Sequence, residues 1–171
     1  MTTTEVSLRE YRGSDAEAMF QLDLACFAEE FRFDRKSMQT FAEEMGALCL
    51  VAETRKPELA GFVIVQVEAH AQVEVEQILA AGRGYVVTLD VAEQWRRRGL
   101  AGRLMAAAEA RVASAGAGWM ELHVFTGNEG AIRFYERLGY ERIGVQRRFY
   151  GKRGLDAFVY RKTLGRDSPI E

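Results

Sequence analysis

The sequence predicts a single α/β (α+β) domain in which a mixed sheet of about seven strands is flanked by about four helices. Its 171 residues suit one domain with a sizeable core. Strand and helix patterns alternate along the chain, and a central strand–helix–strand–helix unit lies between antiparallel hairpins. Strands joined through a helix are normally parallel neighbours with a right-handed crossover. We expect one domain over residues 1–171, with its core over about 5–164.

The composition narrows the class of protein. Hydrophobic residues make up 48% of the chain and charged residues 28%, the balance of an ordinary soluble globular protein. A formal net charge of −2 argues against binding by bulk positive charge, so we expect no nucleic-acid partner. The N-terminus lacks an apolar core of signal-peptide length, and no apolar run approaches a membrane span. We therefore expect a cytoplasmic protein without a membrane partner.

The cysteines and histidines do not form a metal-binding pattern. Cys26 and Cys49 lie in unrelated segments, and His70 and His123 are isolated from each other. A disulfide framework needs more cysteines, and a zinc site needs ligands in close spacing. We expect two buried thiols and no metal.

The first elements are a strand and a helix. Apolar and polar residues alternate over Val6–Tyr11, as in a half-buried strand. Ser14 or Asp15 then caps a helix whose apolar residues recur at i, i+3 and i+7, namely Met19, Leu22 and Cys26.

A second helix and a hairpin follow. Asp34 is the expected cap of a helix that passes through Met38, Phe41 and Met45 and stops at Gly46. The stretches Ala47–Glu53 and Leu59–Glu68 are rich in Val, Leu and Ile and predict two hairpin strands. Residues 69–83 have no clear pattern and end in Gly82-Arg83-Gly84, which we expect to be flexible.

The second half of the chain alternates strands and helices, with glycine at each helix end. The expected elements are a strand over Tyr85–Val91, a helix over Gly99–Ala115, a strand over Trp119–Phe125, a helix over Asn128–Leu138, and strands over Tyr140–Gln146 and Asp156–Leu164. Ligands usually bind at the carboxyl ends of such parallel strands, which here means just after Val91 and Phe125.

A turn rich in arginine and small residues opens the helix after Val91. It reads Arg96-Arg97-Arg98-Gly99-Leu100-Ala101-Gly102. Small residues let the backbone approach a ligand, and the unpaired N–H groups and positive dipole end of a helix start suit a pyrophosphate. The spacing alone is equally compatible with a solvated arginine run on a surface helix. The turn is not a P-loop, because the Gly-Lys-Ser/Thr ending is absent.

Arg96-x-x-Gly99-x-Ala101 resembles the R/Q-x-x-G-x-G/A acetyl-CoA signature of the GNAT acetyltransferases. The resemblance implies the GNAT fold and acetyl-CoA as the cosubstrate. It also implies that the backbone amides of the turn, from Arg96 to Gly102, hold the pyrophosphate. The end of the preceding strand, Leu89-Asp90-Val91, would lie along the pantetheine arm.

A second match covers the strand and helix from Leu122 to Tyr140, which resemble the family's strand, Asn and "A-I-x-x-Y-x-x-x-G-F" segment. The resemblance implies that Asn128 binds the pantetheine arm and that Tyr135 protonates the departing thiolate. The spacing alone predicts instead a core tyrosine at position 135.

The C-terminal part narrows the resemblance to the protein N-terminal acetyltransferases, including the RimI-type ribosomal-protein alanine acetyltransferases. Arg147-Arg148-Phe149-Tyr150, followed by Asp156-Ala157, looks like their "R-x-x-Y-Y … D-A" ending, in which an aromatic loop covers the peptide backbone. Phe27 lies where the family forms the wall of the substrate pocket, although an aromatic stretch there also suits simple core packing. These matches imply that Phe27, Phe149 and Tyr150 bind substrate.

The catalytic base is not the glutamate of the RimI-type members, because His123 stands at that position. One branch of the N-terminal acetyltransferases carries Leu-His-Val here and pairs the histidine, through a water, with a tyrosine that matches Tyr85. Strand alternation puts Met120, Leu122 and Val124 on an apolar face, so His123 and Glu121 point to the other. We expect His123 as base with Tyr85 assisting and Tyr135 as acid. Glu121 is the reserve candidate, and a structural role for His123 stays open.

Three functions remain open. The leading one is acetylation of a peptide or protein N-terminus, and the runner-up is acetylation of a small amine such as a polyamine, an amino acid or a drug. The third is a catalytically silent acetyl-CoA-binding module, which would not need Tyr85, His123 and Tyr135 together. The sequence specifies neither the first residue of an acceptor nor an oligomeric state.

Overall fold

The computed structural model describes residues 5–56, 58–68 and 82–165. The strands are β1 (Val6–Glu10), β2 (Ala47–Thr54), β3 (Leu59–Glu68), β4 (Arg83–Val91), β5 (Trp119–Phe125), β6 (Glu141–Tyr150) and β7 (Leu155–Thr163). The α-helices are α1 (Ala16–Cys26), α2 (Arg35–Glu43), α3 (Leu100–Ser114) and α4 (Glu129–Arg137). Short 3₁₀ turns lie at η1 (Gly13–Asp15), η2 (Glu29–Phe31) and η3 (Glu93–Trp95).

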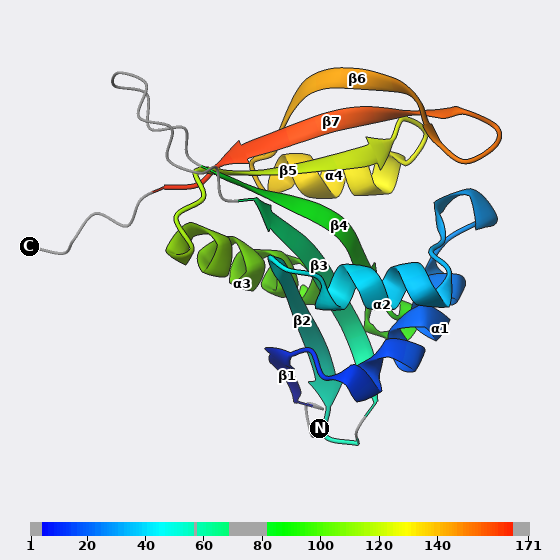
Figure 1. Ribbon diagram of the computed structural model, residues 1–171, viewed down its shortest axis with the longest axis vertical. Coiled ribbons are helices and arrows are strands. Elements are labelled where there is room, and N and C mark those ends of the chain that lie inside the picture. Colours follow the sequence, from blue (N-terminus) through cyan, green and yellow to red (C-terminus); the bar gives the residue numbers. More distant parts are fainter. Residues whose placement is uncertain (1–4, 57, 69–81, 166–171) are drawn as a thin grey trace, which may run out of the picture.

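The strands form one mixed sheet in the order β1-β2-β3-β4-β5-β7-β6 (Figure 1). Each neighbouring pair is antiparallel except β4 and β5, which are parallel and are joined through α3. The predicted mixed sheet of about seven strands with four α-helices is therefore confirmed, as is the predicted order of the elements along the chain.

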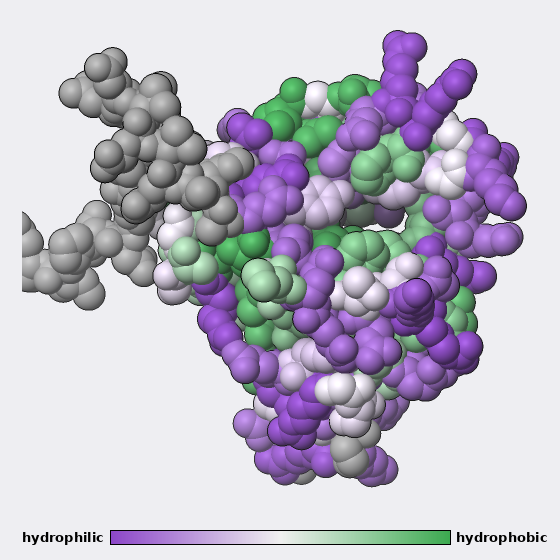
Figure 2. Space-filling model, in the orientation of Figure 1, coloured by the Kyte–Doolittle hydropathy of each residue, from purple (hydrophilic) through white to green (hydrophobic). Residues whose placement is uncertain are grey.

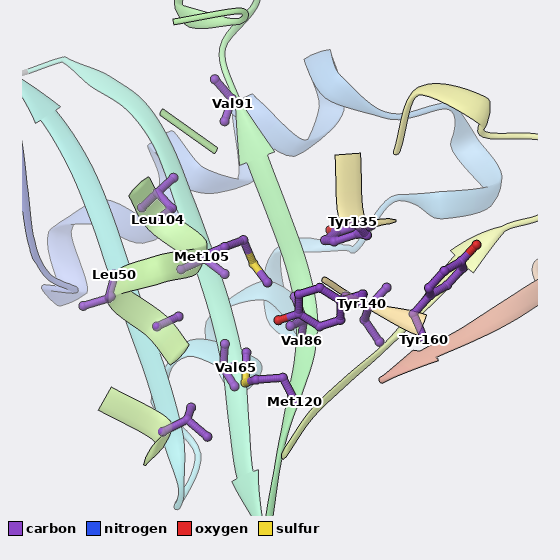
Figure 3. Close-up of a cluster of buried hydrophobic side chains, with 14 of the residues drawn as sticks. Leu50, Val65, Val86, Val91, Leu104, Met105, Met120, Tyr135, Tyr140 and Tyr160 are labelled. Atoms are coloured by element: carbon purple, nitrogen blue, oxygen red, sulfur yellow. The ribbon is translucent and has the colours of Figure 1, made fainter. Parts of the chain in front are cut away.

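Helices cover both faces of the sheet (Figure 1). On one face α1 and α2 pack over the first strands through Met19, Met38 and Phe62. On the other face α3 buries the predicted stripe of Leu100, Leu104, Ala108 and Val112 against the sheet. Figure 3 shows this second cluster, in which Tyr135 of α4 and Tyr140 lie beside Val86 of β4.

The parallel pair β4 and β5 is short and opens into a V. Its pairing covers only Arg83 to Tyr85 against Trp119 to Glu121. Gly84 allows this close approach, because a Cβ there would lie 2.6 Å from the sulfur of Met120. Just beyond it, the β3–β4 register shifts so that Val87 has no partner, a bulge of the kind that bends a strand. After Tyr85 the two strands diverge (Figure 1).

One predicted helix boundary is confirmed and another was wrong. Asp15 is the N-cap residue of α1 as predicted, but its carboxylate accepts from the backbone N–H of Arg12 and pairs with Arg9, so it stabilises the start of η1 and makes no capping bond to α1. Helix α2 is capped by Asp34 as predicted, but it ends at Glu43, and Met45 is 95% exposed outside it. The backbone of Glu44 is already extended, which stops the helix before Met45.

The prediction that Gly82-Arg83-Gly84 is flexible was wrong for its last two residues, because β4 begins at Arg83. The rest of the uninterpreted segment, residues 69–81, lies outside the described residues. Within the described residues, no helix is long and apolar enough to cross a membrane.

Candidate active site

A cavity of about 450 Å³ lies where β4 and β5 diverge. Figure 2 shows the hollow between the part of the molecule that contains α1 and α2 and the part that contains β5 to β7. Most of its lining is apolar or aromatic, and the polar groups are few. The lining includes Phe27, Val87, His123, Asn128, Tyr135 and Tyr150. An apolar cleft with a few convergent polar groups is the usual form of a small-molecule site.

The turn before α3 presents backbone donors to open space. Gly99 is the N-cap of α3 with φ of 77°, and Arg97 also has a positive φ, of 59°. Successive N–H groups of the first helical turn have no partner within the helix. A Cβ at Gly99 or Gly102 would meet no atom within 4 Å, so nothing covers the turn there. Leu100 is buried beneath it, so this position offers its backbone and not its side chain to a ligand.

The arginine side chains of this turn hold the turn itself in place. Arg96 Nε donates to the carbonyl oxygen of Val91 at 3.0 Å, and Arg96 Nη2 lies 3.5 Å from Cys26 Sγ. The guanidinium of Arg98 lies 5.0 Å from the ring centroid of Trp95. Arg96 therefore ties the start of the turn to the ends of β4 and α1. The backbone N–H of Arg96 also has a partner, since it donates to the carbonyl oxygen of Glu93 at 3.2 Å.

Cys26 is only half-buried and lines the cavity, whereas Cys49 is buried as predicted; both are free thiols. The prediction of two buried thiols was thus wrong for Cys26. The thiol lies at the end of α1, where the helix wall meets the cavity. Burial raises the pKa of the Cys26 thiol, so the neutral form is favoured.

Residues predicted to contact the pantetheine arm lie on both sides of the V. Leu89 of β4 and Asn128 at the start of α4 line the cavity. Asn128 Oδ1 accepts from the backbone N–H of Ala131 at 3.1 Å, which caps α4 and leaves the Asn128 amide NH₂ free to donate. Asp90 itself does not line the cavity, and Thr88, which does, donates from Oγ1 to Asp90 Oδ1 at 2.6 Å.

Asp90 and Asp23 form a buried carboxyl pair that the sequence interpretation missed. Asp23 is 0% and Asp90 1% exposed, and burial raises the pKa of both. Asp23 Oδ1 and Asp90 Oδ2 have no donor as carboxylates, and a proton shared between the two carboxyls supplies one. The signal was present, since Asp23 is a charged residue between Met19 and Cys26 on the apolar stripe of α1.

Tyr135 lies in the cavity wall with its hydroxyl unengaged. The residue is buried, and the hydroxyl has no hydrogen bond within the described part of the chain. Its ring packs edge-on against Phe134 and Tyr140, at centroid distances of 5.0 and 5.7 Å. Burial, with a smaller effect of Asp90, raises the pKa of Tyr135, so the phenol keeps its proton. A buried phenol without a partner is available as a proton donor.

His123 is held by three contacts from three directions. Its Nδ1 lies 2.8 Å from the hydroxyl of Tyr85, and its Nε2 lies 2.7 Å from Oε1 of Gln146. The ring of Phe149 stacks on it at 4.0 Å with an interplanar angle of 5°. The resemblance implied a water between Tyr85 and His123, but the structure brings the two side chains into direct hydrogen-bond contact. Of these four residues, His123 is the one that lines the cavity.

A bulge in β6 places Phe149 on the imidazole. The β6–β7 register shifts between Gln146 and Tyr150, and Arg148 has a positive φ of 55°. The carboxylate of Asp156 accepts from the backbone N–H of Arg148 at 3.0 Å and stabilises this left-handed residue. The Asp of the predicted "D-A" motif thus has a visible structural task.

Glu121, the reserve base, is engaged elsewhere. It was expected on the face of β5 opposite the apolar one, and there it is only 8% exposed. Arg83 Nη1 lies 2.7 Å from one of its carboxylate oxygens, and Arg161 Nη2 lies 2.9 Å from the other. Arg83 also pairs with Glu68. Negative and positive side chains therefore alternate across β3, β4, β5 and β7. Both oxygens of the Glu121 carboxylate are therefore held by arginine side chains, and the residue does not line the cavity.

The GNAT acetyltransferase family model matches residues 16–140, which covers the α3 turn, His123 and Tyr135. The chain belongs to the GNAT acetyltransferase family. The match confirms the resemblance drawn from the sequence, and it makes the protein an acetyltransferase that uses acetyl-CoA.

Proteins similar to this chain include named N-acetyltransferases. The chain is 27% identical over 163 residues to the N-alpha-acetyltransferase daf-31 of Caenorhabditis elegans, covering 94% of this chain and 84% of the relative. Its fold is similar to that of Arabidopsis thaliana NAA60 bound to a bisubstrate analogue, with a TM-score of 0.81, 20% identity, and coverage of 94% and 100%. It is also similar to the ribosomal-protein-S18-alanine N-acetyltransferase of Escherichia coli, with a TM-score of 0.77, 19% identity, and coverage of 98% and 99%.

The GNAT site has an aromatic end near α1. Phe31 contacts Phe125 and Tyr150 at centroid distances of 5.2 and 4.9 Å, which joins η2 to β5 and β6. Phe27 and Phe33 line the cavity beside them, and no Asp or Glu does so among the described residues. Those residues also contain no group of three or more side chains that would hold a metal ion.

Proposed function

We propose that this GNAT enzyme transfers an acetyl group from acetyl-CoA to the N-terminal α-amine of a peptide or protein, within one domain whose core spans about 5–164. The observation that carries the proposal is the His123 site, a fixed imidazole in the wall of an aromatic cavity whose described lining residues include no carboxylate. The relatives named for protein N-terminal acetylation support the same acceptor.

Acetyl-CoA fits the V between β4 and β5. The backbone N–H groups from Gly99 to Gly102 hold the pyrophosphate, since they are free donors at the positive end of the α3 dipole. The arginines at 97 and 98 add positive charge beside it. The backbone of β4 from Leu89 to Val91 and the NH₂ group of Asn128 flank the pantetheine arm. This arrangement directs the thioester toward Tyr135.

The reaction forms a C–N bond, breaks a C–S bond, and moves two protons. The amine loses one proton as it attacks, and the sulfur of CoA gains one as it leaves. Because Tyr85 does not itself line the cavity, a water carries the amine's proton to the Tyr85 hydroxyl, and Tyr85 passes its own proton to Nδ1 of His123. Tyr135 donates its proton to the departing sulfur. Holding amine and thioester together supplies much of the remaining rate.

The residues that line the aromatic end of the cavity favour a peptide N-terminus over a polyamine as the acceptor. A polyamine carries several positive charges, and burying them requires carboxylate partners. The cavity offers none among the described residues, and Phe27, Phe31 and Tyr150 instead favour an uncharged, apolar first residue such as Met or Leu. Tyr85, His123 and Tyr135 occur together at this site, which a silent binding module would not need.

An acceptor panel tests the proposal. Release of free CoA thiol is measured with peptides that begin with Met, Leu, Ala, Ser, Asp or Lys, with the same peptides blocked at the N-terminus but carrying a lysine, and with polyamines. We expect turnover only with free N-termini, fastest for Met and Leu. Turnover with polyamines or lysine alone would replace the proposal by the runner-up, and binding of acetyl-CoA without any turnover would restore the silent module.

A further inference from the structure

Gln146 lies outside both matched motifs, and yet its side chain is hydrogen-bonded to that of His123. On β6 it pairs with Ala157 of β7, while His123 of β5 pairs with Val159 of the same strand. Ala157 and Val159 are two residues apart, so Gln146 and His123 project from the same face of the sheet, with β7 between them. Two strand spacings, about 10 Å, separate their backbones. The two side chains close that gap to 2.7 Å.

The identity of the contacting atom determines where the imidazole carries its proton. An amide oxygen only accepts hydrogen bonds, so Gln146 Oε1 beside Nε2 requires a hydrogen on Nε2. In the neutral ring Nδ1 then has a lone pair, which accepts from the hydroxyl of Tyr85. The reversed amide would place a donor against Nε2 and move the ring hydrogen to Nδ1, where it could accept no proton from Tyr85.

We propose that Gln146 is a positioning residue that holds His123 in the Nε2–H tautomer and so keeps Nδ1 as the proton-accepting atom. This inference rests on the proposed function, in which His123 is the base. Gln146 touches neither the cavity nor the reacting atoms and acts only through His123.

The other groups around the imidazole do not select a tautomer. Phe149 stacks on the face of the ring, which fixes its plane but contacts neither nitrogen edge-on. Among the charged groups nearby, Arg83 lies over the ring of Tyr85, and Glu121 is engaged by Arg83 and Arg161. Gln146 is thus the one described partner of Nε2.

Nitrogen NMR of ¹⁵N-histidine-labelled protein measures the tautomer without reference to activity. The chain has two histidines, so a His123→Ala sample assigns the signal. We expect Nε2–H in the wild type. Gln146→Met, of similar length but without an acceptor, is expected to give a mixture of tautomers. Gln146→Glu restores an acceptor and is expected to keep Nε2–H. Val145→Glu, at a 55% exposed neighbour on the other face of β6, controls for the added charge.

Kinetics of the same variants separate positioning from folding. For Gln146→Met we expect kcat to fall about tenfold, as for other partners that orient a functional histidine, with KM for acetyl-CoA unchanged. For Gln146→Glu, the carboxylate stabilises the charged ring, so the acid limb of the pH–rate profile moves up by about one pH unit. Val145→Glu is expected to keep the wild-type profile.

Three results would overturn the proposal: an Nδ1–H tautomer in the wild type, an unchanged spectrum in Gln146→Met, or a changed spectrum with unchanged kcat. The third result also removes His123 as the base while leaving acetyl transfer intact. If the wild type transfers acetyl to no acceptor, the proposed function fails, and the spectra still decide whether Gln146 holds the tautomer.

Discussion

The hydroxyl of Tyr85 and Nδ1 of His123 lie 2.8 Å apart at the point where β4 and β5 separate. Tyr85 is the last residue of the parallel pairing, opposite Glu121, and His123 is the first outward-facing residue beyond it. The last backbone pairing of β4 with β5 therefore sets the distance between the two side chains. The divergence of the strands beyond it gives the imidazole access to the cavity. The fold thereby places the imidazole, with Tyr85 behind it, in the wall of the cavity.

Replacing His123 by Ala is expected to lower kcat about 100-fold at pH 7, because the amine loses its proton acceptor. The loss should shrink as pH rises past about 8, where a peptide α-amine is neutral without help. Burial raises the pKa of Tyr85 to about 12, so its hydroxyl stays protonated over the assay range, and Tyr85→Phe is expected to cost about tenfold. A pH profile of kcat for peptide acetylation measures both, and wild-type turnover in His123→Ala at every pH would contradict the assignment.

Tyr135→Phe tests the proton donor, since it removes the hydroxyl and leaves the ring packing. We expect kcat to fall about 100-fold with KM for acetyl-CoA nearly unchanged. Tyr140→Phe is the matched control, because its hydroxyl is buried nearby but donates to Glu109. An equal fall in kcat for the two variants would show that lost packing, not proton donation, explains the effect.

Glu121→Gln separates the reserve base from a structural role. Glu121 is nearly buried between Arg83 and Arg161, and removing its charge leaves two guanidinium groups without their partner. Since both arginines keep partial solvent contact, we expect a loss of about 2 kcal/mol in the free energy of unfolding. Denaturant titration measures this loss. The pH profile of kcat should keep its shape, and a lost acid limb in this variant would identify Glu121 as the base.

The Asp23–Asp90 pair predicts a pH-dependent stability. Burial raises the pKa of both carboxyls above the ordinary value of 3.8, so the folded protein retains a proton that the unfolded chain releases. The pair's contribution is complete below pH 3.8 and is lost as pH rises through the raised folded pKa.

Asp23→Asn supplies a permanent donor to Asp90 and keeps an acceptor for the backbone N–H of Phe33. The unfolding temperature of the variant, relative to wild type, should therefore increase as pH rises from 5 to 9. Glu93→Gln, at an exposed position, is the control for loss of one negative charge. A constant difference across this pH range would refute the shared proton.

Local patterns predicted the elements of the fold well, because each depends on neighbours in sequence. The stripe of α3, the strand Trp119–Phe125 and the cap at Asp34 were all confirmed. The predicted end of α2 was wrong, because Met45 fits the helical period and yet is 95% exposed outside the helix.

Long-range contacts were beyond what the sequence patterns specify. Gln146 reaches His123 across an intervening strand, which requires the register of β5, β6 and β7. Asp90 lies beside Asp23 of a helix distant in sequence, so its position in the motif gave no hint of this buried carboxyl pair. Glu121 lies on the face of β5 that strand alternation predicts, but two arginines from neighbouring strands cover its carboxylate.

The most direct test of the account is one peptide that offers both kinds of amine, a free N-terminal Met and an internal lysine, incubated with enzyme and acetyl-CoA. Tandem mass spectrometry then locates the acetyl group. The account predicts acetylation of the α-amine alone, which His123→Ala slows at pH 7. Acetylation of the lysine side chain, or of neither amine while acetyl-CoA binds, would contradict it.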